Sequence, residues 1–170
     1  VGGAMAGIAA VLLVLCGVPM TFEGTTVAQT LEGAAQRIAR GPVAAFVAIK
    51  QLGTNGGGFF GPNSTHPFEN TGFLCNWIEC VSILVIPMAC VWLYGHITRR
   101  TKHAQVIFMV MLSLLLVKLA FATVLEQTPS AALHGLAVVR TENLEGKELR
   151  FGTVSAPVWA TFTTCTSNGS

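Results

Sequence analysis

Three long apolar stretches constrain the fold of this chain more than any other feature. They cover residues 1–20, 72–95 and 104–125, and the first of them contains no charged side chain. Each is close to the roughly 20 apolar residues that a helix needs to cross the hydrocarbon core of a bilayer. We therefore predict an all-α polytopic membrane protein in which these segments span the lipid bilayer.

The overall composition supports this class and excludes others. Hydrophobic residues make up 52% of the 170 residues and charged residues 11%, against roughly 25% charged residues in an ordinary soluble domain. The net charge of +2 is small and dispersed, so we expect no nucleic-acid partner. All eight acidic residues are glutamates. This chain therefore cannot form an aspartyl-phosphate, and we expect no catalytic residue and no covalently bound cofactor on it.

The loop over residues 96–103 predicts the orientation in the membrane. It contains Arg99, Arg100 and Lys102 and no acidic residue. Loops enriched in Lys and Arg remain on the cytoplasmic side. Threading the chain from this loop places residues 21–71 and 126–170 on the outer side of a plasma membrane.

Two short polar strips containing glycine lie outside the apolar stretches. Gly53–Phe60 reads GTNGGGFF, and Ser167–Ser170 reads SNGS. Irregular backbone at membrane depth is tolerated only where it is buried in protein or lines a water-filled path. The short apolar segments 42–52 and 157–165 precede the strips, and each opens with a proline, which suits the first turn of a helix. We predict two re-entrant half-helices whose C-terminal ends point at the strips.

The order of these parts repeats along the chain. Residues 1–95 contain a span, an outer loop, a half-helix, a strip and a second span, and residues 104–170 repeat this order as far as the strip. The expected outer loops are 21–40 and 126–155, and the expected ion-binding segments within the strips are 54–58 and 167–170. Two unrelated glycine turns are the alternative, which the matching half-helices weaken.

The strips have the chemistry of a cation site. Consecutive backbone carbonyls can replace the hydration shell of a cation, glycine reaches the unusual dihedrals required, and a helix C-terminus adds partial negative charge. A phosphate cradle is disfavoured because Phe59–Phe60 follows instead of a Lys-Ser or Lys-Thr pair. A plain outer turn stays open, since Asn-Gly is a common turn pair. The candidate residues are Thr54, Asn55, Gly56, Gly57, Gly58, Ser167, Asn168, Gly169 and Ser170.

The segment GTNGGGFFGPNSTHPFEN, residues 53–70, closely resembles the second selectivity-filter region of the potassium-binding subunit (KdpA family) of the Kdp potassium-transporting ATPases. Three other segments are similar to stretches of that subunit in the same order: LEGAAQRIARGPVA at 31–44, NLEGKELRFG at 143–152 and TTCTSNGS at 163–170. The resemblance implies potassium-channel-like repeats of span, pore helix, filter and span. We expect an internal fragment that holds the second repeat and the third repeat up to its filter.

The resemblance also implies a function. The expected role is that of the potassium-binding and potassium-translocating subunit of an ATP-driven, high-affinity import complex in a bacterial or archaeal plasma (inner) membrane, with K⁺ as the transported ion. The implied partners are a P-type ATPase catalytic subunit, which carries the phosphorylated aspartate, and small accessory subunits. The alternatives are a stand-alone potassium channel or ion-gradient-driven transporter of related architecture, and a membrane protein without transport.

Several charged residues near these elements need an explanation. Glu79 and Lys118 lie inside expected spans, where an ionisable group is a functional candidate by default, although pairing or snorkelling near the outer interface is favoured. Lys50, at the end of the first half-helix, is expected to point away from the strip, toward a carboxylate. His66 and Glu69 lack a third ligand at zinc-like spacing and are expected to pack the loop.

Overall fold

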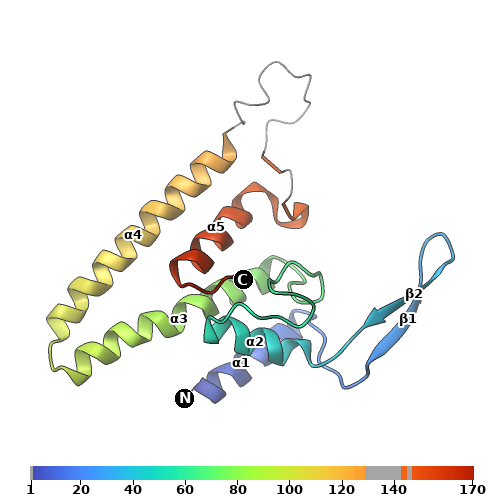
Figure 1. Ribbon diagram of the computed structural model, residues 1–170, viewed down its shortest axis with the longest axis horizontal. Coiled ribbons are helices and arrows are strands. Elements are labelled where there is room, and N and C mark those ends of the chain that lie inside the picture. The colour runs from blue at the N-terminus through green and yellow to red at the C-terminus, as the bar shows by residue number, and fades with distance from the viewer. Residues whose placement is uncertain (1, 129–142, 145–146) are drawn as a thin grey trace. The chain divides into compact units, whose positions relative to one another are not determined.

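The computed structural model describes residues 2–128, 143–144 and 147–170 (Figure 1). The chain divides into two compact units, Val1–Ser82 with Gly169–Ser170, and Ile83–Asn168. The described residues are mostly helical. The elements in chain order are α1 (Gly2–Leu15), β1 (Thr25–Gln29), β2 (Ala35–Ala39), α2 (Val43–Gly53), α3 (Phe73–Ile97), α4 (Thr101–Gln127), the 3₁₀ turn η2 (Leu149–Phe151) and α5 (Gly152–Cys165).

Helices α3 and α4 are long and apolar enough to cross a membrane, with 25 and 27 residues. At about 1.5 Å per residue they reach about 38 and 40 Å, more than the roughly 30 Å hydrocarbon core. Their facing ends extend beyond the predicted spans 72–95 and 104–125, so the connection between them is shorter than the predicted loop 96–103. The reason is local: α3 runs to Ile97, the backbone turns at Arg99, which has a φ of 54°, and α4 starts two residues later.

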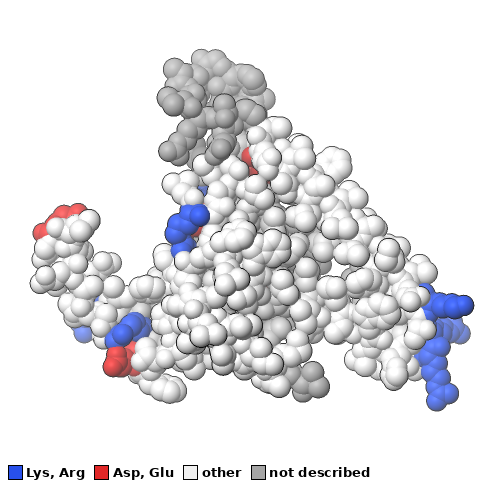
Figure 2. Space-filling model, turned by 180° about the vertical axis from the view of Figure 1, so that it is seen from behind, with Lys and Arg blue, Asp and Glu red and all other residues white. Residues whose placement is uncertain are grey.

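The turn between α3 and α4 is tight and basic. Trp92 of α3 lies 5.6 Å from Phe108 of α4 between ring centroids, and a side chain on Gly95 would collide with Ala104. Basic side chains gather at this turn, with no acidic side chain beside them on the face seen in Figure 2. This charge distribution is the feature that predicts a cytoplasmic turn.

Helix α1 covers Gly2–Leu15 and so ends five residues before the end of the predicted span 1–20. Gly17 has a φ of 94°, and the amide of Val18 donates to the Leu13 carbonyl over 3.0 Å. This pattern ends a helix by satisfying its last carbonyls, and Pro19 follows at once.

An antiparallel hairpin occupies the predicted outer loop 21–40, so the expectation of an all-α fold is wrong at this point. β1 pairs with β2 from Thr25 opposite Ala39 to Gln29 opposite Ala35. Gly33, with a φ of 82°, lies in the connecting turn, and Glu23 forms an ion pair with Arg40 at the base. The segment is too short and too polar to show the apolar stretch that predicts the helices.

In the first unit, α1 and α2 pack against each other (Figure 1). Their contact buries Leu13 of α1 and Val43, Val47 and Ala48 of α2. Pro42 immediately precedes α2, at its N-cap position, where the missing N–H costs no hydrogen bond. The helix covers 43–53, against a predicted interval of 42–52.

In the second unit, α5 packs against α4. α5 begins at Gly152 rather than at the predicted position 157, so Pro157 lies inside the helix and not in its first turn. The early start has a local cause, because η2 leads directly into α5. The Glu148 side chain caps η2 by accepting from the Arg150 amide over 3.3 Å, and the hydrogen bond from the Arg150 side chain lowers the pKa of Glu148. Residues 129–142 and 145–146 of the predicted outer loop 126–155 lie outside the described residues, and η2 and the start of α5 occupy its last part.

Candidate cation site

The first strip begins where α2 ends. Thr54 has a left-handed backbone with a φ of 49°. Its amide donates to the Gln51 carbonyl, and the Asn55 amide donates to the Lys50 carbonyl, both over 3.4 Å. This pair of bonds is the Schellman arrangement, in which glycine is the usual left-handed residue. A β-branched threonine in this conformation is an outlier, and Gly56 follows with a φ of 72°.

The second strip repeats this backbone at the end of α5. Ser167 has a φ of 57° and Gly169 a φ of 76°. Between them, the Asn168 amide donates to the Thr163 carbonyl over 2.9 Å, again five residues back. The two strips therefore have matching conformations as well as matching Ser/Thr-Asn-Gly sequences.

Two other helices end in a left-handed residue without forming such a strip. Gly17 follows α1 and Arg99 follows α3. Among the described residues, positive φ angles at alternate positions occur only at Thr54 and Gly56 and at Ser167 and Gly169. The second left-handed residue distinguishes the strips from an ordinary helix end.

A buried ion pair supports the downstream end of the first strip. Lys50 is 3% exposed and Glu69 is fully buried, and the Lys50 ammonium lies 3.3 Å from Oε2 of Glu69. The other carboxylate oxygen, Oε1, accepts hydrogen bonds from the amides of Phe59, over 2.6 Å, and Phe60, over 2.9 Å. One carboxylate thus joins the last turn of α2 to the downstream end of the strip.

A second buried network lies beside this pair. The Gln51 amide group donates to Oε2 of Glu79 over 2.8 Å and to the Ser64 hydroxyl over 3.0 Å. The Cys75 thiol lies 3.5 Å from Oε1 of Glu79. These contacts tie α2 to the first turns of α3 through the loop between them.

These contacts answer the questions raised by the charged residues. Lys50 turns to a carboxylate, as predicted. Glu79 is 1% exposed and bonded within the first unit, so it pairs and does not snorkel. Lys118 is exposed on α4. His66 stacks on Phe60 with ring centroids 4.0 Å apart, and together with the bonds of Glu69 this packing confirms that both residues hold the loop.

The remaining candidate residues lie along the same backbone. The Asn55 side chain accepts from the Gly57 amide over 3.2 Å. A side chain on Gly58 would collide with the Gly61 carbonyl and lie 3.0 Å from Oε1 of Glu69. Asn168 and Ser170 are buried, with 3% and 9% exposure. The first unit contains the whole of the first strip together with Gly169 and Ser170.

Sequence reasoning expects Glu69 to pack the loop but misses its hydrogen bonds to the amides of Phe59 and Phe60, and it misses the role of Gln51. A signal for Glu69 is present, because a lysine near the end of a buried half-helix requires a counter-charge. Glu69 is the first acidic residue after the strip. Gln51 leaves no comparable signal, since an amide side chain is compatible with either face of a helix.

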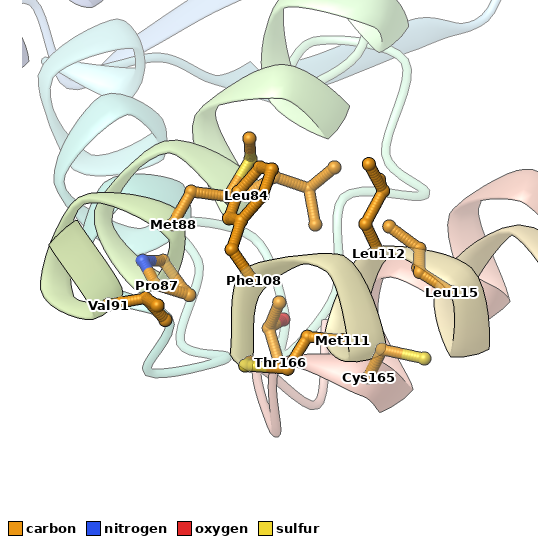
Figure 3. Close-up of a pocket in the computed structure, with 10 residues that line it drawn as sticks. All are labelled: Leu84, Pro87, Met88, Val91, Phe108, Met111, Leu112, Leu115, Cys165 and Thr166. Atoms are coloured by element: carbon orange, nitrogen blue, oxygen red, sulfur yellow. The ribbon is translucent and has the colours of Figure 1, made fainter. Parts of the chain in front are cut away.

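A cavity of about 80 Å³ lies in the second unit, beside the C-terminal turn of α5. Figure 3 shows apolar side chains of α3, such as Leu84 and Met88, facing those of α4, such as Phe108 and Leu112. The Thr166 hydroxyl at its edge donates to the Phe162 carbonyl over 2.9 Å. This lining offers no cage of oxygens, so the cavity is not a cation site.

Two long apolar helices in a mostly helical chain are compatible with a helical membrane protein. Residues 4–170 match the family model described as the potassium-transporting ATPase A subunit. The chain belongs to this family.

Curated relatives carry names consistent with this family. A potassium-transporting ATPase potassium-binding subunit from Pseudomonas putida is 49% identical over 95% of this chain. The protein of the same name from Bacteroides thetaiotaomicron is 48% identical over 94% of this chain. The match covers 28% of the length of each relative, so the chain corresponds to a little over a quarter of either protein.

Proposed function

We propose that the chain is part of a potassium-binding and potassium-translocating subunit of an ATP-driven potassium import complex. Thr54–Gly58 and Ser167–Ser170 would form two strands of a selectivity filter that binds K⁺ through backbone carbonyls. Family membership and the names of the two relatives support the ion and the type of complex. They also favour this function over a stand-alone channel.

The observation that carries the proposal is the shared backbone of the two strips. Each follows a helix C-terminus, where the helix dipole favours a cation. Each has positive φ angles on both sides of an asparagine. Strained backbone that recurs at equivalent positions of a repeat requires a reason, and such strain concentrates at functional sites. Coordination of a dehydrated cation is a reason that fits the oxygen-rich backbone.

The proposed architecture follows from this assignment. Helices α2 and α5 act as pore helices, α1, α3 and α4 belong to the membrane-spanning part, and the strips face the outside. The basic turn between α3 and α4 faces the cytoplasm. Further strands of the filter come from parts of the subunit outside this chain.

The complex requires partners to use ATP. Without an aspartate in its sequence, this chain cannot carry a phosphorylated aspartyl group. A P-type ATPase subunit would supply that residue, with small accessory subunits completing the complex. Potassium uptake that continues in the absence of ATP and of the ATPase subunit would contradict this part of the proposal.

The filter is tested by Gly56→Asp in the full-length subunit within its complex. A side chain and a charge at a left-handed position should disturb the carbonyl cage. We expect uptake and ATPase activity to need a higher K⁺ concentration for half-saturation, or to discriminate less well against Na⁺. Gly33→Asp is the matched control, because Gly33 also has a positive φ, of 82°, but lies in the hairpin turn. Wild-type K⁺ dependence in Gly56→Asp would refute the filter.

A further inference from the structure

We infer that Glu69, held by Lys50, is a positioning residue for ion selectivity, because its carboxylate fixes the backbone at the downstream end of the first strip. This inference rests on the proposed function and deepens it. It concerns two residues outside the strip, which act through the amides of Phe59 and Phe60 and do not contact the ion.

The two oxygens of the Glu69 carboxylate have different partners. Oε1 accepts hydrogen bonds from the amides of Phe59 and Phe60 over 2.6 and 2.9 Å. Oε2 accepts from the Lys50 ammonium over 3.3 Å. Hydrogen bonds to an ionised acceptor are about twice as strong as neutral ones. The carboxylate therefore restrains two consecutive peptide groups immediately after Gly58.

Burial makes this arrangement unusual for a loop. Glu69 is 0% exposed and Lys50 is 3% exposed. A buried charge is costly unless it is paired and hydrogen-bonded, and here each charge supplies the partner of the other. A neutral hydrogen-bonding residue could hold the loop without this cost, so the charged pair indicates a need for tighter placement.

Lys50 links the loop to the other end of the strip. Its own carbonyl accepts the Asn55 amide over 3.4 Å, so its backbone fixes the start of the strip while its side chain fixes Glu69. Gly58 packs closely against this ion pair. A Cβ atom at position 58 would lie 3.1 Å from the Lys50 ammonium and 3.0 Å from Oε1 of Glu69. The strip is thus fixed at both ends by one residue pair.

A tight hold at both ends has a consequence for selectivity. A strip that can relax would close around a smaller ion such as Na⁺, whereas a strip of fixed span keeps its carbonyls at one separation. Loss of the carboxylate should therefore lower discrimination between ions in the complex that still assembles, in addition to the loss of stability caused by a buried, unpaired Lys50.

The first test replaces Glu69 in the full-length subunit of the purified complex. Glu69→Gln keeps the shape but removes the charge, and Glu69→Asp keeps the charge but shortens the side chain so that it cannot reach Lys50 and both amides together. We expect Glu69→Gln to lower the selectivity for K⁺ over Na⁺, measured as the ratio of the two half-saturation concentrations, by about tenfold or more. This is the size expected for the loss of hydrogen bonds to a charged group. Glu69→Asp should show a smaller loss of the same kind.

The matched control is Glu79→Gln. It also removes a buried carboxylate bonded to α2 in the first unit, but the oxygens of Glu79 contact the side chains of Gln51, Ser64 and Cys75 rather than the strip backbone. We expect its effect to be limited to the yield or thermal stability of the complex, with selectivity unchanged. An equal loss of selectivity in Glu79→Gln would overturn the specific role of Glu69.

The exchanged pair Lys50→Glu with Glu69→Lys separates pairing from positioning. Opposite charges remain together, so assembly should be retained or recovered. Selectivity should stay poor, because a lysine at position 69 can only donate and cannot accept the two amides. Wild-type selectivity in this double variant, in Glu69→Gln or in Glu69→Asp would overturn the inference.

The outcomes for this pair and for the filter can be told apart. If Gly56→Asp changes K⁺ dependence and the Glu69 variants do not, the filter stands and the positioning role fails. If the wild-type complex has no K⁺-dependent activity, the proposed function itself fails.

Discussion

At the first strip, the carbonyl that accepts the Asn55 amide belongs to Lys50, a buried cation paired with Glu69. At the second strip, the carbonyl that accepts the Asn168 amide belongs to Thr163, a neutral residue that is 7% exposed. The backbone conformation is the same, and the side chain behind it differs. A helix end followed by two left-handed residues recurs in both strips, whereas the residue whose carbonyl accepts the asparagine amide is charged at the first strip and neutral at the second.

This difference has a physical meaning. A backbone conformation set by local hydrogen bonds can recur in every repeat, because it depends only on the helix end and on residues that tolerate positive φ. A buried ion pair needs two residues from separate segments and offsets its desolvation cost only where the geometry is good. Repeats that share a backbone can therefore evolve different supports.

The largest expected effect tests what the strips share. Gly169→Asp should impair K⁺ dependence as strongly as Gly56→Asp, because both glycines have positive φ angles, of 76° and 72°. The measurement is the K⁺ concentration that half-saturates uptake by the full-length complex, with each substitution made in a separate variant. A defect in one variant and wild-type behaviour in the other would show that matching backbones do not have matching roles.

A smaller effect tests what the strips do not share. Lys50→Met leaves the Glu69 carboxylate buried without its cation, which should cost about 3–5 kcal/mol. Thr163→Val removes one buried hydroxyl, which should cost about 1 kcal/mol. The midpoints of thermal unfolding of the two purified complexes should differ accordingly. Equal shifts would contradict the view that the supports are different.

The smallest effect concerns backbone strain. A left-handed backbone costs an L-residue roughly 1–2 kcal/mol. Replacing it with glycine recovers only part of this free energy, because glycine loses more conformational freedom on folding. Thr54→Gly should therefore raise the stability of the complex by about 0.5–1 kcal/mol, and Ser167→Gly by less, because serine is not β-branched. Thermal unfolding would detect the order of the two. A loss of stability in both variants would mean that the hydroxyls hold the strips more firmly than the strain disfavours them.

Much of this structure follows from patterns within the sequence, and the rest depends on contacts between distant residues. Apolar length locates α3 and α4, and the repeated Ser/Thr-Asn-Gly order locates both strips. The hairpin around Gly33 is not predicted because its short strands show little apolar character. The start of α5 is predicted wrongly because Pro157, which lies inside the helix, has the sequence signature of a helix start. The partner of Lys50 can be expected to be a carboxylate but not identified, since that depends on how the loop folds back.

The most direct test is to locate the bound ion in the full-length complex, by anomalous scattering from crystals soaked in Rb⁺ or Tl⁺ as substitutes for K⁺. We expect an ion coordinated by backbone oxygens of both Thr54–Gly58 and Ser167–Ser170. Ion density elsewhere in the subunit, with both strips empty under conditions that saturate transport, would contradict the filter.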